Sequence, residues 1–264
     1  MYFNHKIVWI TGASSGIGEA LAYAFVQAGA TVILSARRVA ELDRVKTACG
    51  EKQDQVHIAP LDLTQQDDMP DFVASWVEKL GRIDILVNNG GISQRALTTE
   101  TDLSVDRRIM EVNYFGQIAF TKAVLPYMVT QGSGQIAVIS SLTGKFGFPL
   151  RSAYAASKHA LHGFFETLYL EMYDQGIRVT LVNPGRIRTN ISLNALTKDG
   201  SPHGEMDPGQ EKGMPVDVCA RKILSALRKQ KVEIQVGGFD TIMVYFKRYM
   251  PWLFRYIAKR IDAK

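Results

Sequence analysis

The chain has 264 residues, of which 46% are hydrophobic and 22% charged, and this ordinary globular usage excludes a disordered or collagen-like protein. A formal net charge of +5 raises the question of a nucleic-acid or membrane partner. The charge is uneven, however, because residues 239–264 carry a net +4 and the first 238 residues together only +1. The basic character therefore belongs to a C-terminal segment.

Short apolar runs alternate along the chain with longer stretches in which apolar residues recur at helical spacing. The runs predict strands at 7–10, 31–34, 56–59, 83–87, 136–139, 179–182 and 232–236. The stretches predict helices at 19–28, 40–49, 67–80, 104–130, 153–173 and 216–229. This alternation predicts an α/β fold of the Rossmann type, a doubly wound, seven-stranded parallel sheet flanked by helices. We expect a single catalytic domain over 1–238 and a basic amphipathic extension over 239–264.

A glycine-rich turn follows the first predicted strand. The segment Thr11–Gly18 reads TGASSGIG and leads directly into a predicted helix. Glycines let the backbone turn sharply and come close to a pyrophosphate, while the helix N-terminus offers free N–H groups to the anion. The segment therefore predicts a dinucleotide-binding loop, whose candidate cofactor-binding residues are Gly12, Ser14, Ser15, Gly16, Ile17 and Gly18.

The end of the second strand bears on the choice of dinucleotide. An acidic residue at this place usually binds the adenosine ribose, but here the strand ends with Ala36, Arg37 and Arg38. Guanidinium groups pair well with a 2′-phosphate, so we predict NADP(H), with Arg37 favoured over Arg38 and Ser35 as a helper. The alternative is that the two arginines simply begin a solvated helix.

Tyr154 and Lys158 are the candidate proton donor and its partner, since residues at i and i+4 share one helix face. A neighbouring ammonium lowers the pKa of a tyrosine from its usual value of about 10. The spacing alone is weak evidence, because Tyr2 and Lys6 repeat it ahead of the glycine turn and have no expected role.

These motifs, taken in order, resemble the short-chain dehydrogenase/reductase family. The resemblance rests on TGASSGIG, on Asn88-Asn89-Gly90-Gly91 after the fourth strand, and on Ser141 thirteen residues before Tyr154. It implies catalytic roles for Asn113, Ser141, Tyr154 and Lys158. In the family the serine holds the substrate oxygen, the tyrosine exchanges the proton, and the asparagine supports a water behind the lysine.

The resemblance also extends the cofactor site. It implies that Asp62 contacts the adenine edge, although an aspartate there is also suited to capping a helix. Gly90 stands where the family usually has alanine, and we expect the lost methyl group to be tolerated. The further cofactor-binding residues implied are Leu63, Asn89, Gly90, Tyr154, Lys158, Pro184, Gly185, Ile187 and Thr189.

Two segments concern the substrate. Residues 190–215 are rich in glycine and proline and are expected to form a substrate lid. The chain most resembles the steroid- and retinoid-type branch of the family, which implies a bulky apolar alcohol or carbonyl. Ser141, Leu142, Phe148 and Ile191 are the candidate substrate residues, and Phe146, Pro149, Leu193 and Met206 are further candidates for the wall.

The extension after Gly238 mixes aromatic, aliphatic and basic residues, and Pro251 is expected to divide it into two short helices. Such helices lie on anionic membrane surfaces, or their apolar face covers the active site or a partner subunit. Both alternatives stay open at this point. A nucleic-acid partner is not expected, because no recognition module accompanies the charge.

The sequence thus predicts an NADP(H)-dependent oxidoreductase, a carbonyl reductase or alcohol dehydrogenase using tyrosine as general acid/base. The alternative is a catalytically silent NADP-binding regulatory or scaffold protein. The two cysteines and the absence of an apolar leader favour a cytoplasmic location. No metal is expected, since His159 and His162 lack further ligands and are interpreted as packing or interface residues. A homodimer or homotetramer is implied by the resemblance.

Overall fold

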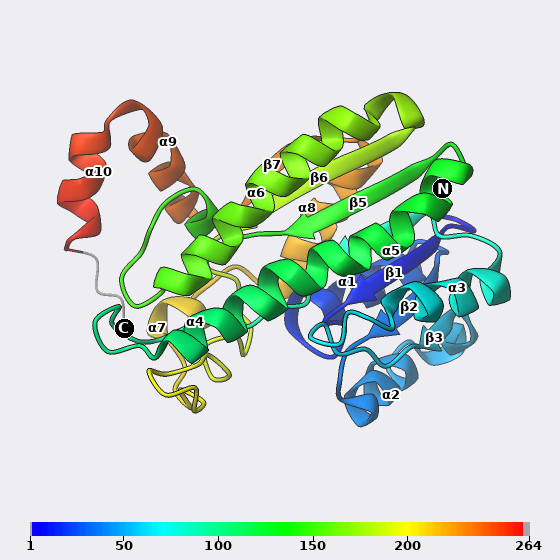
Figure 1. Cartoon of the computed structure of the whole chain (residues 1–264), viewed down its shortest axis with the longest axis horizontal. Coiled ribbons are helices and arrows are strands. Elements are labelled where there is room, and N and C mark those ends of the chain that lie inside the picture. Colours follow the sequence, from blue (N-terminus) through cyan, green and yellow to red (C-terminus); the bar gives the residue numbers. More distant parts are fainter. Residues whose placement is uncertain (1, 261–264) are drawn as a thin grey trace.

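Seven parallel strands form one sheet in the computed structural model, which describes residues 2–260 (Figure 1). Their order across the sheet is β3-β2-β1-β4-β5-β6-β7. The predicted fold class is confirmed, and each strand lies within two residues of its predicted ends. The strands are β1 (Ile7–Thr11), β2 (Thr31–Ser35), β3 (Val56–Ile58), β4 (Ile85–Asn88), β5 (Gly134–Ile139), β6 (Ile177–Pro184) and β7 (Glu233–Val236).

Helices cover both faces of the sheet, which explains why the strands are apolar throughout. In β1, Val8 and Ile10 pack into the core on one face and Trp9 into the core on the other, and all three are fully buried. A parallel sheet buried on both sides requires this pattern. One layer consists of α1 (Gly16–Gln27), α2 (Val39–Thr47) and α8 (Val216–Arg228), and the other of α3 (Met69–Leu80), α5 (Gly116–Thr130) and α6 (Ser152–Met172).

The strand order reverses between β1 and β4, and this reversal places the site. Loops that leave the carboxyl ends of two such strands diverge and open a crevice between them. The glycine turn follows β1, and the Asn89-Gly90 segment follows β4. Thr11 joins the two, because its Oγ1 accepts the N–H of Asn89 at 3.0 Å and that of Gly90 at 3.1 Å.

The predicted helix over 104–130 is interrupted, which corrects the sequence prediction. It consists of α4 (Leu103–Met110), a π-helical turn (Glu111–Phe115) and α5. The wider turn carries Asn113, and single π turns of this kind are frequent at functional sites. Short 3-10 turns elsewhere are η1 (Gly50–Gln55), η3 (Leu142–Gly144), η4 (Tyr173–Gln175) and η5 (Phe239–Thr241).

The lid segment and the C-terminal extension lie at the same end of the sheet. The lid contains the short helix α7 (Pro208–Glu211), and Leu196 within it forms β-bridges with Gln94 and Pro202. The extension folds as α9 (Ile242–Tyr249) and α10 (Pro251–Ala258), divided at Pro251 as predicted, at one end of the long axis (Figure 1). Part of the predicted extension, residues 261–264, lies outside the described residues.

Within residues 2–260, no helix combines the length and the apolar character needed to cross a bilayer.

Candidate active site

The glycine turn has a conformation that only glycine adopts without strain. Gly12 has φ +64° and Gly16 has φ +61°. A Cβ on Gly12 would lie 2.7 Å from the Cα of Gly90, which is too close for any real contact. The turn thus packs directly against the segment after β4, and α1 begins at Gly16, earlier than predicted. The first N–H groups of α1 precede its first intrahelical hydrogen bond, which runs from Glu19 to Ser15, so the helix itself leaves them available to an anion.

Arg38, rather than the favoured Arg37, is brought to this turn. The Arg38 Nη2 donates to the Ser14 Oγ at 3.3 Å, whereas Arg37 is exposed and makes no hydrogen bond through its side chain within residues 2–260. Arg44 also reaches the turn, donating to the Ser14 carbonyl at 3.3 Å and pairing with Glu19 at 2.7 Å. Sequence reasoning missed Arg44, because only the docking of α2 beside α1 brings it there.

Ser35 does not take the helper role that was predicted. Its side chain lies within the sheet, where its Oγ accepts from the Trp9 Nε1 at 2.8 Å and donates to the Ala59 carbonyl at 2.6 Å. The residue is 1% exposed, so its hydroxyl is committed to the core rather than to a phosphate.

The segment after β3 contributes Asp62 and Leu63. The Asp62 Oδ1 accepts from the backbone N–H of Thr64 at 3.0 Å and from its hydroxyl at 2.9 Å. These bonds lie within a turn and cap no helix, because α3 begins only at Met69, after Asp68. Leu63 explains the glycine at position 90, because its Cδ1 lies 2.6 Å from where a Cβ on Gly90 would be. A leucine methyl group occupies the place of the missing alanine methyl group.

Asn89 ties the segment after β4 to the glycine turn. Its Nδ2 donates to the carbonyls of Thr11 and Gly12, each at 3.0 Å. This amide therefore fixes the turn from the side of β4, while its predicted role beside the cofactor stays a prediction.

Ser141, Tyr154 and Lys158 line one cavity of about 790 Å³ at the carboxyl end of the sheet. Ser141 follows β5, while Tyr154 and Lys158 lie on α6. The Lys158 Nζ donates to the Ile139 carbonyl at 2.8 Å and lies 5.8 Å from the centroid of the Tyr154 ring. The structure thus brings these three predicted catalytic residues together.

Burial dominates the acid–base properties of this pair. It lowers the pKa of the Lys158 ammonium to about 8, because the charged form loses its hydration. It also raises the pKa of the Tyr154 hydroxyl, against the opposing effects of a hydrogen bond with Ser141 and of the charges of Arg95 and Arg151. A ligand that interacts with the ammonium would stabilise its charge and, through it, the phenolate.

Asn113 is completely buried and bridges two parts of the site. Its Oδ1 accepts from the Ile92 N–H at 2.8 Å, and its Nδ2 donates to the Ile92 carbonyl at 2.9 Å and to the Ser157 Oγ at 3.1 Å. The asparagine thus holds the segment after β4 against α6 beside Lys158. Ser157 was not predicted, although its position next to Lys158 was a signal.

Gln94 is a second residue that sequence reasoning missed. It is fully buried, and its Oε1 accepts the N–H groups of Ala153 at 2.9 Å and Tyr154 at 3.4 Å. These are otherwise unpaired donors of the first turn of α6, so Gln94 caps the helix and positions the backbone of Tyr154. No motif marks a cap that comes from so distant a segment.

The cavity runs from the glycine turn to the C-terminal extension. Its wall includes the predicted cofactor residues Ile17, Asn89, Pro184, Gly185, Ile187 and Thr189, and the predicted substrate residues Leu142, Phe146, Phe148 and Ile191. Pro149, Leu193 and Met206 do not line it, which corrects the prediction. Met206 instead lies within the lid, where its sulfur accepts from the Ser192 hydroxyl at 3.3 Å.

The extension supplies part of the same wall. Met243 of α9 and Phe254, Ile257 and Ala258 of α10 line the cavity, and Phe254 packs against Phe146 with ring centroids 5.2 Å apart. The inner face of the extension therefore covers the site, which was one of the two alternatives that the sequence left open. The cavity volume is that of an ordinary small-molecule site.

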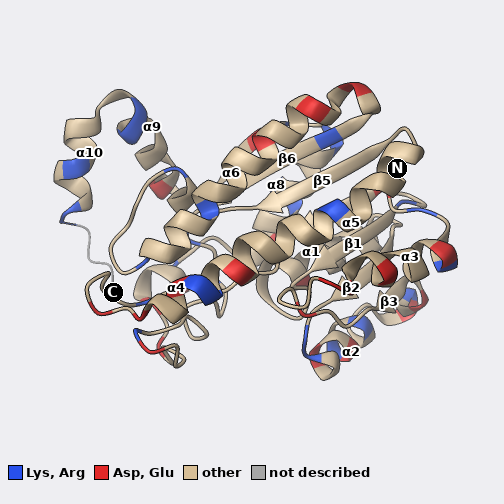
Figure 2. Cartoon of the chain, viewed as in Figure 1, with Lys and Arg blue, Asp and Glu red and all other residues tan. Residues whose placement is uncertain are grey.

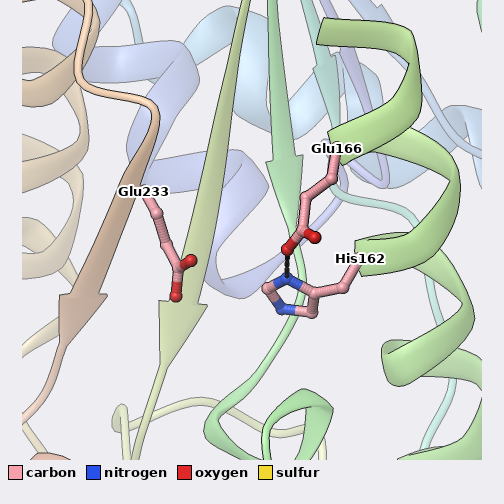
Figure 3. Close-up of side chains that lie close together, drawn as sticks. All are labelled: His162, Glu166 and Glu233. Atoms are coloured by element: carbon pink, nitrogen blue, oxygen red, sulfur yellow. Dashed lines mark hydrogen bonds and ion pairs between the residues drawn. The ribbon is translucent and has the colours of Figure 1, made fainter. Parts of the chain in front are cut away.

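His162 and Glu166 on α6 lie close to Glu233 on β7, whose side chain is directed toward the other two (Figure 3). The His162 Nε2 lies 2.9 Å from the Asn183 Oδ1, and its Nδ1 lies 3.3 Å from the Glu166 Oε1. Lys145 places its ammonium 3.0 Å from Glu233 and 3.8 Å from Glu166, so both carboxylates are already paired with a cation. His162 is buried and hydrogen-bonded at both ring nitrogens.

Comparisons with known proteins bear directly on this arrangement. The family model described as short chain dehydrogenase matches residues 6–199. The chain is 46% identical over 261 residues to a Drosophila melanogaster protein named dehydrogenase/reductase SDR family protein 7-like, covering 97% of this chain and 80% of that protein. It is 41% identical over 267 residues to the Rattus norvegicus dehydrogenase/reductase SDR family member 7B, with coverage of 98% and 82%.

Solved structures give the same result. A short-chain dehydrogenase from Streptomyces avermitilis superposes with a TM-score of 0.81 at 31% identity, covering 98% of this chain and all of that one. An alcohol dehydrogenase from Thermococcus sibiricus, complexed with 5-hydroxy-NADP, superposes with a TM-score of 0.76 at 26% identity, covering 89% and 97%.

Proposed function

The chain belongs to the short-chain dehydrogenase/reductase family of oxidoreductases, and we propose that it interconverts a secondary alcohol and a carbonyl compound with NADP(H). The observation that carries this proposal is the placement of Ser141, Tyr154 and Lys158 in one cavity that extends to the glycine turn. The residues present fit a dinucleotide, since the turn excludes side chains and ends at a free helix N-terminus.

A bound nicotinamide would supply or accept the hydride. Ser141 holds the carbonyl oxygen of the substrate by donating its hydroxyl. Tyr154 donates the proton that converts the developing oxyanion to an alcohol. Lys158, whose Nζ lies 5.8 Å from the Tyr154 ring, stabilises the phenolate left behind. Asn113 keeps the segment beside Lys158 in place through its bonds to Ile92 and Ser157.

Replacing Tyr154 with Phe tests this mechanism. We expect kcat for reduction of a panel of carbonyl compounds to fall about 10²–10⁴-fold, as loss of a general acid does, with little change in NADPH affinity. Tyr2→Phe is a matched control, because Tyr2 and Lys6 share the same spacing but bond Gln135 and Asp84 far from the cavity. Unchanged turnover in Tyr154→Phe would refute the role. A wild-type protein that binds NADPH but reduces none of the panel would favour the silent binding protein.

The preference for NADP(H) rests on the surroundings of Ser14. Arg38 bonds the Ser14 hydroxyl and Arg44 the Ser14 carbonyl, while β2 ends without an acidic residue. We expect Arg38→Ala to weaken NADPH binding about 10–100-fold, the usual effect of losing a hydrogen bond to a charged group, and to leave NADH binding unchanged. Arg37→Ala is the matched control. Tighter binding of NADH than of NADPH by the wild type would overturn the assignment.

An apolar substrate is proposed from the lining of the cavity. Leu142, Phe146 and Phe254 form a buried cluster at its wall, and Phe148 and Met243 pack against them. Apolar walls bind apolar bodies through the surface that both remove from water.

Peripheral membrane contact is proposed for the outer face of the extension. Trp252 and Tyr249 are each 70% exposed, and neither α9 nor α10 contains an acidic residue (Figure 2). The basic residues beside them are Lys247, Arg248, Arg255, Lys259 and Arg260. Exposed aromatic rings among cations suit an anionic lipid surface. The two buried cysteines are free, as in proteins of a reducing compartment. We therefore propose a cytoplasmic protein that binds reversibly to membrane surfaces.

Vesicle co-sedimentation tests that contact. We expect binding to vesicles of phosphatidylcholine and phosphatidylserine, weakened by salt, and little binding to phosphatidylcholine alone. Trp252→Ala should reduce it, whereas Leu103→Ala, which removes a 60% exposed side chain from α4, should not. Equal binding by both variants would exclude this face.

A homodimer formed through α5 and α6 is also proposed, since members of the family are commonly oligomeric. The exposed Leu170 of α6 and Phe115 beside α5 support this surface, and light scattering of Leu170→Glu against the wild type tests it.

A further inference from the structure

A charged cluster stands in the wall of the same cavity, where the lid meets the first turn of α6. It consists of Arg95 from the segment after β4, Arg151 immediately before α6 and Asp207 immediately before α7. The Asp207 Oδ2 lies 2.5 Å from the Arg95 Nη2 and 2.9 Å from the Arg151 Nη2. None of the three has a role in the mechanism proposed above.

The cluster carries one positive charge more than its single carboxylate balances. Arg95 and Asp207 are both buried, and the Arg151 side chain is 13% exposed. Burial, followed by repulsion from Arg95, lowers the pKa of Arg151 to about 10. Burial is the largest single influence on Asp207 and raises its pKa, but the hydrogen bond with Arg95 and the charges of Arg95, Arg151 and His203 together outweigh it and lower the pKa, so the carboxylate is ionised and already shared. A partly buried cation without a full counter-charge is unfavourable unless an anion accompanies it.

The two arginines differ in how many donors they have left. Arg95 is committed, since it also donates to the Ser93 Oγ at 2.9 Å and the Gln94 carbonyl at 2.6 Å. Arg151 donates only to Asp207 and, at 3.3 Å, to the Pro149 carbonyl, so among the described residues its Nε–H has no partner. Its guanidinium lies 5.0 Å from the Phe148 ring, itself part of the cavity wall. Arg151 therefore offers a fork of donors beside an apolar surface.

We propose that Arg151, supported by Arg95, binds an anionic group of the substrate, so that the substrate combines an apolar body with a carboxylate or phosphate. An arginine fork matches the paired oxygens of both groups. The apolar body packs against Phe148 and the cluster around Phe146 and Phe254. This inference deepens the proposed function and rests on it only for the identity of the reacting group, because binding itself requires no turnover.

A binding experiment on the NADP⁺-loaded protein separates the two proposals. Laurate, dodecyl phosphate and dodecanol have the same apolar chain and differ in the head group, and each is used below the concentration at which it aggregates or separates from water. We expect the wild type to bind at least one of the two anions about tenfold more tightly than dodecanol. The better of the anions identifies the head-group chemistry.

Arg151→Leu should remove that tenfold preference and leave the affinity for dodecanol within about twofold, because only the binding of a charged head group depends on the charge of Arg151. Arg151→Lys keeps the charge without the fork and should retain only part of the preference. Arg188→Leu removes an exposed arginine that lies outside this cavity and should bind as the wild type does. Melting temperatures establish that each variant is folded.

Equal affinity of the wild type for the anions and the alcohol would overturn this inference and leave the oxidoreductase proposal untouched. So would an Arg151→Leu protein that keeps the preference. An Arg151→Leu protein that weakens all three ligands equally would show a structural role for the arginine. Conversely, anion binding that persists in a wild type without carbonyl reductase activity would support the anion site and refute the proposed function.

Discussion

The loops after β1 and β4 build their part of the site from the backbone, whereas the cavity wall around Tyr154 is built from side chains of distant segments. At the glycine turn, Gly12 approaches Gly90 so closely that no Cβ fits between them. At the opposite end, Phe146 precedes α6 and Phe254 follows α9, and they meet only in the folded chain. We expect the glycine turn to select its ligand through the shape of the backbone and the dipole of α1. The side-chain wall leaves the choice of substrate open to variation.

Gly12→Ala is the strongest test of the backbone half. A left-handed φ of +64° costs an alanine about 1–2 kcal/mol, and the added Cβ also collides with Gly90. We expect NADPH affinity, measured by fluorescence titration, to fall at least about 100-fold, since both effects displace the turn.

Gly147→Ala is the control for Gly12→Ala. Gly147 lies in the loop before α6, and a Cβ there would meet no atom within 4 Å. An unchanged NADPH affinity in Gly12→Ala, or an equal loss in the control, would show that the backbone of the glycine turn does not determine cofactor binding.

The pH dependence of reduction tests the side-chain half. The proposed mechanism of reduction requires Tyr154 to carry its proton and Lys158 to carry its charge, and burial lowers the pKa of Lys158 to about 8. As pH rises through that value the ammonium is lost, so kcat/KM for reduction should fall about tenfold per pH unit above it. Stopped assays between pH 6 and 10, with melting temperatures at each pH, check this result. A flat profile to pH 10 would contradict it.

Phe254→Ala examines the contribution of the extension to the wall. Phe254 is 8% exposed and packs against Phe146 and Leu142, so its loss opens the apolar wall without touching the glycine turn. We expect KM for an apolar ketone to rise several-fold, up to about tenfold, consistent with about 1–1.4 kcal/mol of lost contact. NADPH affinity should stay within twofold. Trp252→Ala, on the outer face, should leave KM unchanged.

The sequence predicted the backbone half of the site more completely than the side-chain wall, and the reasons are physical. The glycine turn and the pair Tyr154 and Lys158 could be predicted because local backbone geometry and helical spacing determine where they point, whereas Ser141 was predicted only from the resemblance to the family. The predictions of Pro149, Leu193 and Met206 as wall residues were wrong. Pro149 lies in the irregular loop before α6 and the other two in the lid, whose path depends on contacts such as that between Arg95 and Asp207. No local pattern reports such contacts.

The same reasoning explains the errors at single residues. Arg38 rather than Arg37 reaches Ser14, and Arg38 immediately precedes α2, so its direction depends on how that helix is placed. The Ser35 hydroxyl is hydrogen-bonded to Trp9 and Ala59, which are its neighbours only across the sheet. The π-helical turn at Asn113 replaced a continuous helix, and apolar periodicity does not distinguish the two.

Gly90→Ala should have the smallest effect of these changes, and it tests whether a side chain contributes to the part of the site that is built from backbone. Gly90 has no left-handed φ, so alanine is compatible with its backbone and gains about 0.4–1 kcal/mol by restricting the unfolded chain. Against this, the new methyl group must displace the Leu63 Cδ1 from a distance of 2.6 Å. A leucine end turns more easily than backbone does, so we expect the free energy of unfolding to change by less than about 1 kcal/mol.

The double variant Leu63→Val, Gly90→Ala isolates that single contact. Removing the leucine end leaves room for the methyl group, so the pair should be more stable than the sum of the two single changes. Urea unfolding of all four proteins measures this coupling. If the coupling is zero, Leu63 does not take the place of the alanine methyl group. At position 90 the part of the site that is built from backbone would then not depend on any side chain.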